Sequence, residues 1–132
     1  MIVLDEQLKN AGLTEAIQRW YRGRVVSITT LRPGTVIKDD VIPLLLRQVS
    51  DPIFVTINVT DFWQRTAADR HFCVACFPLT DDRAGEIPEL LRRLLQLPEF
   101  RTKRERQGKV IRASQTQVQY YPHDGRIRTL SW

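Results

Sequence analysis

The feature that most constrains the fold is a strict alternation of short apolar runs with segments of helical periodicity. Each apolar run is rich in β-branched residues and is typical of a strand. These runs span residues 2–4, 24–30, 53–59 and 71–77. Between and after them, apolar residues recur at helical spacing over residues 13–21, 41–49 and 87–95. This order predicts an α/β fold, a three-layer sandwich with a mainly parallel central sheet, because parallel strands covered on both faces read as continuous hydrophobic runs.

The pattern changes in the last third of the chain. Residues 101–109 are charged and lack apolar periodicity. Two extended runs follow, 110–121 and 126–132, with Asp-Gly between them, which is a strong β-hairpin signal. We expect an α/β unit over residues 1–100, and a basic segment and a C-terminal β-hairpin over residues 101–132 as part of the same domain.

Length and composition favour one ordinary globular domain. The chain has 132 residues, of which 42% are hydrophobic, enough to bury a core without disulfides or a structural metal. Its opening apolar residues are interrupted at once by Asp5 and Glu6, so no secretory segment can be drawn there. No apolar run approaches the roughly 20 residues needed to span a bilayer. We therefore expect a soluble cytoplasmic protein that does not associate with membranes.

Cys73 and Cys76 are the only cysteines, and they have CxxC spacing. That spacing could indicate half of a zinc site or a redox pair, but the chain has no second pair. Both lie in an apolar run in which an extended backbone directs residues three apart to opposite faces. We therefore expect two buried thiols in a core strand.

Positive charge is concentrated in the C-terminal third. Up to Ile87 there are 10 Lys and Arg against 11 Asp and Glu, and from Pro88 onward there are 10 against 4. A positive face suits a polyanionic partner such as RNA, because counterion release drives such binding; a merely solvated basic surface would give the same composition. The candidate nucleic-acid-binding residues are Arg101, Lys103, Arg104, Arg106, Lys109 and Arg112.

Aromatic and histidine side chains give weaker signals. Three rings flank the expected hairpin: Tyr120, Tyr121 and Trp132. They could stack on bases, although folding the hairpin onto the domain is the favoured use. Trp20 and Tyr21 fall on the apolar face of the first helical pattern, and we expect them in the core. His71 and His123 have no acid or nucleophile in evident register, and we assign them no chemistry.

Acidic residues follow the first three strand runs. Asp5 and Glu6 follow the first, Asp39 and Asp40 open the helix after the second, and a third group, Asn58 and Asp61, ends the next run. Ligands of open parallel sheets bind outside the carboxyl ends of the strands. These oxygen donors predict a site for Mg²⁺ or Mn²⁺. The alternative is that Asp39 or Asp40 only caps a helix and that Asp61 caps the short segment after the third strand.

Three segments together resemble a known family. An apolar strand ends in Asp-Glu within residues 2–8, an acid opens a helix within residues 38–42, and a strand runs into Thr-Asp-Phe within residues 54–62. Combined, they resemble the PIN-like proteins related to VapC toxins and Mut7-C domains. The resemblance implies a metal-dependent endoribonuclease that hydrolyses RNA with Mg²⁺ or Mn²⁺. It also implies the toxin half of a toxin–antitoxin pair, with a cognate antitoxin protein as partner and a homodimer as a further expectation.

The resemblance also assigns roles to individual residues. Asp5, Asp39 and Asp61 correspond to the metal-binding and catalytic acids, with Glu6 as a further catalytic acid. Asp40 and Asn58 would assist in holding the metal.

The chain departs from the family pattern at two positions. Asn58 stands where the family usually has another Asp, and Lys38 stands where it has Ser. These departures leave open a catalytically decayed PIN-like domain that binds RNA or a protein without cleaving. A third reading is a phosphoacceptor domain of the receiver type, which has a similar acidic pattern. We disfavour it because the sequence offers no convincing fifth strand and helix, and Lys109 has no Pro soon after it.

Overall fold

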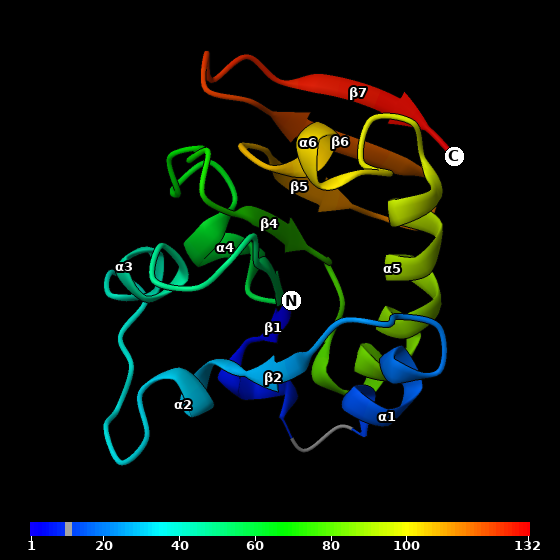
Figure 1. The fold of residues 1–132 in the computed structure, drawn as a ribbon. Helices are drawn as coiled ribbons and strands as arrows, with labels where there is room; N and C mark the ends of the chain where they lie inside the picture. Colours follow the sequence, from blue (N-terminus) through cyan, green and yellow to red (C-terminus); the bar gives the residue numbers. More distant parts are fainter. Residues whose placement is uncertain (10–11) are drawn as a thin grey trace.

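The protein forms an α/β fold around one mixed sheet of seven strands (Figure 1), described from a computed structural model that covers residues 1–9 and 12–132. The strands are β1 (Ile2–Leu4), β2 (Val25–Ser27), β3 (Ile53–Thr56), β4 (Cys73–Cys76), β5 (Val110–Ala113), β6 (Gln117–Tyr121) and β7 (Arg128–Ser131). Their order in the sheet is β2-β1-β3-β4-β5-β6-β7. The first five are parallel, and β6 and β7 are antiparallel to their neighbours.

Helices cover both faces of the sheet, an arrangement compatible with a three-layer sandwich (Figure 1). One face carries α1 (Leu13–Gln18) and α5 (Ile87–Gln96). The other carries α2 (Ile28–Leu31), α3 (Ile42–Leu46) and α4 (Val59–Phe62). The remaining elements are the short helix α6 (Lys103–Arg106) and the 3-10 helices η1 (Glu6–Leu8) and η2 (Asp81–Glu86).

Alternate residues of each strand build two separate cores. Ile53 and Val55 pack on the side of α1 and α5, whereas Phe54 packs on the side of α3 and α4. Cys73 and Cys76 divide in the same way, one thiol in each core. Both are buried and free, and burial raises the pKa of each thiol to about 12. The expectation of two buried thiols in a core strand is confirmed. The raised pKa values keep both thiols protonated, and the thiolate is the reactive form.

Three of the strands predicted from the sequence are longer than those in the structure. The run 24–30 divides into β2 and α2, because the Ser27 hydroxyl accepts from the Thr29 amide and caps a helix. The run 53–59 likewise ends as β3 and turns into α4. The run 110–121 folds back on itself as β5 and β6, with the Ser114 amide donating to the Gln117 carbonyl at 2.9 Å. Each strand ends at a polar cap or turn, and hydrophobicity alone does not indicate these end points.

The C-terminal segment is part of the same sheet. The predicted hairpin is present as β6 and β7, with the Gly125 amide donating to the Pro122 carbonyl across the turn. Ahead of it, β5 pairs in parallel with β4, so the segment adds three strands where the sequence predicted two. Among the described residues, no helix is long and apolar enough to cross a membrane.

Candidate functional site

Parallel strands give the sheet two chemically different edges. Residues that follow β1 and β3 lie at its carboxyl edge, and residues that precede β4 and β5 lie at its amino edge. A strand of four residues, such as β3, separates the two edges by about 13 Å. The candidate acids and most of the candidate basic residues fall on opposite sides of this division.

Asp5 is the buried member of the acidic group. Its amide continues the β1 ladder to the Val55 carbonyl at 2.9 Å, which fixes the side chain at the carboxyl edge. Only 5% of Asp5 is exposed. Its carboxylate accepts from the Thr56 hydroxyl at 2.6 Å and from the Glu6 amide at 2.8 Å. Burial raises the pKa of Asp5 against these hydrogen bonds, and the negative charges of Glu6 and Asp61 raise it further.

Asp39 lies in a turn ahead of α3. The Val41 amide donates to the Lys38 carbonyl at 3.0 Å and closes this turn. Neither Asp39 nor Asp40 caps the helix: Val41 is the N-cap residue, and no side chain bonds there. The pKa of Asp39 is raised to about 6. Partial desolvation is the largest cause, and a hydrogen bond to Asp61 and the nearby negative charges raise the pKa further. Helix capping therefore does not explain this aspartate.

Asn58 and Asp61 are held together by the first turn of α4. Asn58 is the N-cap, and its Oδ1 accepts from the Asp61 amide at 3.2 Å. Its Nδ2 donates to Asp61 Oδ2 at 2.7 Å. These contacts, with the hydrogen bond from Asp39, lower the pKa of Asp61. Asn58 caps this helix, so the alternative of Asp61 as the cap is wrong.

The acids share their pocket with two arginines. An open pocket of about 390 Å³ is lined by Asp39, Asp40 and Asp61 together with Arg47 and Arg65. Sequence reasoning did not single out these arginines. Arg47 pairs with Asp69 at 2.6 Å, and the charge of Arg65 lowers the pKa of Asp61. Carboxylate and guanidinium groups therefore line the same pocket.

The donor set has the chemistry of a hard-cation site. Carboxylate oxygens are the ligands that Mg²⁺ and Mn²⁺ prefer, and the charges of Asp5, Asp40 and Asp61 all bear on Asp39. Within the described ranges, no three acidic, histidine or cysteine side chains stand close enough to form a complete coordination group. Asp5, Asp39 and Asp61 are the residues that would hold a cation here. Glu6 is exposed beside Asp5, and the Asn58 carbonyl is already engaged with α4.

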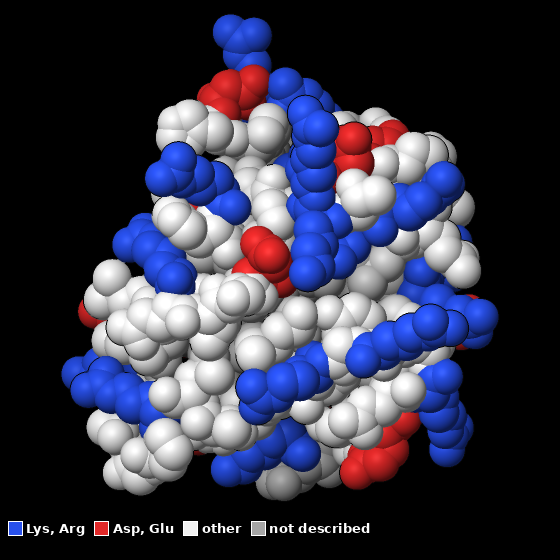
Figure 2. All heavy atoms as spheres, in the orientation of Figure 1, with Lys and Arg blue, Asp and Glu red and all other residues white. Residues whose placement is uncertain are grey.

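Most of the predicted nucleic-acid-binding residues lie at the amino edge. Lys103 stands 3.8 Å from Asp51, which precedes β3. Lys109 donates to the Glu99 carbonyl at 3.0 Å, and its own carbonyl accepts from Val74 at the start of the β4–β5 pairing. Figure 2 shows Lys and Arg side chains spread over the face that carries α5 and α6, with fewer Asp and Glu side chains.

Arg112 is the exception among the six. It stands opposite Cys76 near the carboxyl ends of β4 and β5, and its Nη1 donates to Gln119 Oε1 at 3.5 Å. The other five, Arg101, Lys103, Arg104, Arg106 and Lys109, all precede β5. None of the six lines the acidic pocket, which the sequence alone did not reveal.

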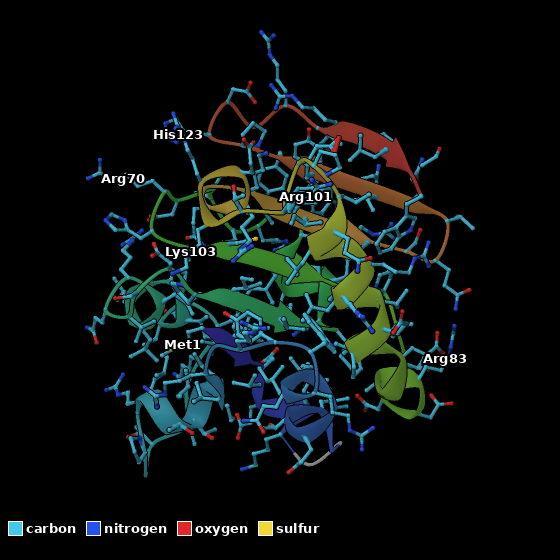
Figure 3. The ribbon with its side chains drawn as sticks, turned by 45° about the vertical axis from the view of Figure 1, so that its right-hand side comes forward. Met1, Arg70, Arg83, Arg101, Lys103 and His123 are labelled. Atoms are coloured by element: carbon cyan, nitrogen blue, oxygen red, sulfur yellow. The ribbon has the colours of Figure 1, made fainter. Side chains whose placement is uncertain are left out.

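His71 has an acidic partner that the sequence pattern did not show. Its Nδ1 lies 2.8 Å from Asp69 Oδ1, two residues earlier. His71, Arg70 and His123 line one open pocket at the amino edge, and Figure 3 shows Arg70 and His123 side by side. The expectation that His71 lacks a paired acid is wrong, because the turn before β4 folds Asp69 back onto the ring.

The structure has a fifth parallel strand, which removes one argument against a phosphoacceptor domain of the receiver type. The position of Lys109 relative to that strand supplies another argument against it. The strand order β2-β1-β3-β4-β5 is that of flavodoxin-like sheets. A receiver would need an aspartate directly after β3 and a lysine directly after β5. Here β3 is followed by Ile57 and by the neutral amide of Asn58, and Lys109 precedes β5 at the opposite edge. The chemistry of that class is therefore not assembled.

Comparisons with family models, with curated proteins and with solved structures each found no match. The functional reading thus depends on the site itself.

Proposed function

We propose that this protein is a PIN-like, divalent-metal-dependent endoribonuclease of the cytoplasm, with Asp5, Asp39 and Asp61 as the acids that hold Mg²⁺ or Mn²⁺. The observation that carries the proposal is the crowding of carboxyl groups at the carboxyl edge. Asp39 lies in the turn ahead of α3 and Asp61 in α4, and both line the same pocket. Desolvation, together with the negative charges of neighbouring aspartates, raises the pKa of Asp39 to about 6. A divalent cation would relieve this repulsion.

The chain's own groups supply the rest of a phosphodiesterase site. Thr56 fixes Asp5 from behind, so that one carboxylate is rigid while Asp39 and Asp61 face the open pocket. Arg65 and Arg47 line that pocket and suit the charge of a phosphate. Glu6 is an exposed acid next to Asp5, suited to accept a proton. A bound divalent ion polarises a phosphoryl oxygen and acidifies water in sites of this kind.

The partners belong to the same proposal. RNA is the expected substrate, and a cognate antitoxin protein and a second copy of the chain are the expected protein partners. The sheet ends in β7, whose residues are mostly exposed, so a further strand could pair there.

A second candidate function is a PIN-like module that binds RNA or a protein partner without cutting. The engagement of Asn58 favours it, because both polar atoms of its side chain are used within α4. PIN-like proteins usually have a metal-binding Asp at this position. In this second candidate, the Asn58 side chain only stabilises the start of α4.

Manganese calorimetry followed by an RNA cleavage assay tests the proposal. We would compare the wild type with an Asp39→Asn, Asp61→Asn double variant and with Asp81→Asn, an exposed acid of η2 outside the pocket lining. The proposal expects binding and cutting in the wild type and in Asp81→Asn, and loss of both in the double variant. RNA binding without cutting in manganese would favour the second candidate. A wild type that binds no manganese at millimolar concentration would exclude the nuclease.

A further inference from the structure

A second pocket lies at the amino edge of the sheet, away from the acidic cluster. It is open, has a volume of about 430 Å³ and sits between the residues that follow α1 and the C-terminal half of α5. Figure 3 shows Arg101 just beyond one end of α5, with Arg83 near the other end. The lining residues with aromatic or charged side chains are Trp20, Tyr21, Arg92, Arg101 and Arg106.

Arg106 is a buried cation without a counter-charge. Only 8% of the residue is exposed, and its Nη1 donates to the carbonyls of Phe100 at 3.3 Å and Arg101 at 3.2 Å. Its Nε is buried without a hydrogen-bond partner, and within residues 1–9 and 12–132 no carboxylate forms an ion pair with it. A buried charge left uncompensated is costly, so an anion would stabilise this site.

Two further guanidinium groups face the same pocket. Arg92 and Arg101 are both exposed, and Arg101 Nη2 is steadied by the Gln96 carbonyl at 3.3 Å. No acidic residue is part of the described lining. Three guanidinium groups around one space have the planar, multiple donors that match phosphate oxygens.

The opposite wall is aromatic and rigid. Trp20 and Tyr21 are half-buried and meet edge to face, with ring centroids 6.1 Å apart. Tyr21 packs directly on Gly23, where an added Cβ would stand 2.7 Å from its ring. Trp20 Nε1 is buried and has no partner among the described residues, a rare state for an indole N–H. Exposed ring surface beside arginines suits a nucleobase.

From this wall and these cations we infer that the pocket binds a nucleotide, with its phosphate on Arg92, Arg101 and Arg106 and its base against Trp20 and Tyr21. The volume falls in the range of small-molecule sites. The nucleotide could be free or one unit of an RNA strand. The inference does not depend on the acidic site, because the two pockets share no lining residue.

Titration of the full chain with AMP, monitored by tryptophan fluorescence and calorimetry, tests the inference. Arg92→Gln and Arg101→Gln should each weaken AMP binding about tenfold, because each removes a charged hydrogen bond to phosphate. Both sites are exposed, so the variants should fold. Arg126→Gln is the matched control, an exposed arginine between β6 and β7 outside the lining, and should leave affinity unchanged. Trp20→Phe should abolish the change in fluorescence.

Further ligands distinguish the sources and the competing explanations. AMP should bind about tenfold more tightly than inorganic phosphate, because phosphate lacks a base to stack. Tighter binding of a short oligoadenylate, with the same arginine dependence, would assign the site to RNA; equal or weaker binding would assign it to a free nucleotide. The Asp39→Asn, Asp61→Asn variant should bind AMP like the wild type, which separates this test from that of the nuclease.

Several outcomes would overturn the inference. If Arg126→Gln weakened AMP binding as much as Arg101→Gln, the arginines would act as a diffuse basic face and not as a pocket. Equal affinity for AMP and phosphate would exclude the base contact. Binding of a glutamate-rich peptide in place of AMP would assign the pocket to an acidic protein partner instead.

Discussion

At the scale of single residues, the three aspartates differ because their environments differ. Asp5 is buried and fixed by two donors, Asp39 is open but crowded by like charges, and Asp61 receives hydrogen bonds that favour its charged form. Identical side chains thus have pKa values shifted in different directions. Carboxyl groups whose pKa values are shifted in this way contribute little to folding stability. A bound ligand is the better explanation for their arrangement.

The raised pKa of Asp39 predicts a pH-dependent penalty on stability. Its pKa of about 6 in the folded protein exceeds the ordinary 3.8, so the folded state binds the proton more tightly. Stability should therefore fall as the pH rises from about 4 through about 6, and the penalty should be complete above that window. After a discount for solvent exposure, Asp39→Asn should stabilise the protein by about 1 kcal/mol at about pH 8, with no gain near pH 4.

Urea unfolding of both proteins at several pH values measures this difference. A variant less stable than the wild type at about pH 8 would mean that the Asp39 carboxylate has a structural role that the contacts do not reveal.

Thr56 should be important for stability because it is fully buried and its hydroxyl bonds to two partners, one of them the buried Asp5. Its hydroxyl donates to Asp5 at 2.6 Å and accepts from the Asn58 amide at 2.9 Å. Thr56→Val keeps the shape but leaves both partners unsatisfied, so we expect a loss of about 2–3 kcal/mol. Thr60→Val, at an exposed position of α4, is the control and should change stability by less than about 0.5 kcal/mol. Equal effects in urea unfolding would contradict the role assigned to the hydroxyl.

At the scale of elements, short polar caps decide where strands end and helices begin. Ser27 ends β2 by capping α2, and Asn58 starts α4 two residues after β3. Helices of four residues have too few apolar positions to show a period, so hydrophobic patterning merged them with the preceding strands. The longer α5 was predicted closely, because four of its ten residues form a continuous buried stripe.

Two substitutions of Asn58 should separate its capping role from its effect on the acids. Asn58→Ala should cost about 1 kcal/mol, because it removes the cap of α4. Asn58→Asp keeps a good cap but replaces the donor to Asp61 with a negative charge. We expect it to lower stability without metal and to increase manganese affinity, by calorimetry and by urea unfolding with and without manganese. Unchanged manganese affinity in the Asn58→Asp variant would remove the acidic cluster as a cation site.

At the scale of the whole molecule, the parallel sheet separates two kinds of surface. Acids gather after β1 and β3, and the basic segment gathers before β5 at the other edge. The acidic pocket and the pocket beside Arg106 share no lining residue. The separation also means that variants at one edge should leave ligand binding at the other unchanged.

The C-terminal segment should be indispensable for folding. Val110 and Ile111 of β5 are fully buried, and Val118 and Tyr120 of β6 pack into the same core as α5. A chain truncated after Phe100 would expose the β4 edge and one end of both cores. We expect it to lack a cooperative unfolding transition, whereas the full chain should show a single one by circular dichroism. A truncated chain that unfolds cooperatively would show that residues 1–100 fold alone.

The sequence by itself determined the fold class, the two buried thiols, the terminal hairpin and the placement of acids after strands. These features are local: the period of hydrophobicity, the Asp-Gly turn and the order of elements depend on neighbouring residues. Only the tertiary structure decided which charges meet. Asp39 and Asp61 line one pocket, and Trp20 and Arg106 line another, although each pair is far apart in the sequence. Parallel pairing brings them together, because it places the ends of strands at one edge of the sheet and their beginnings at the other.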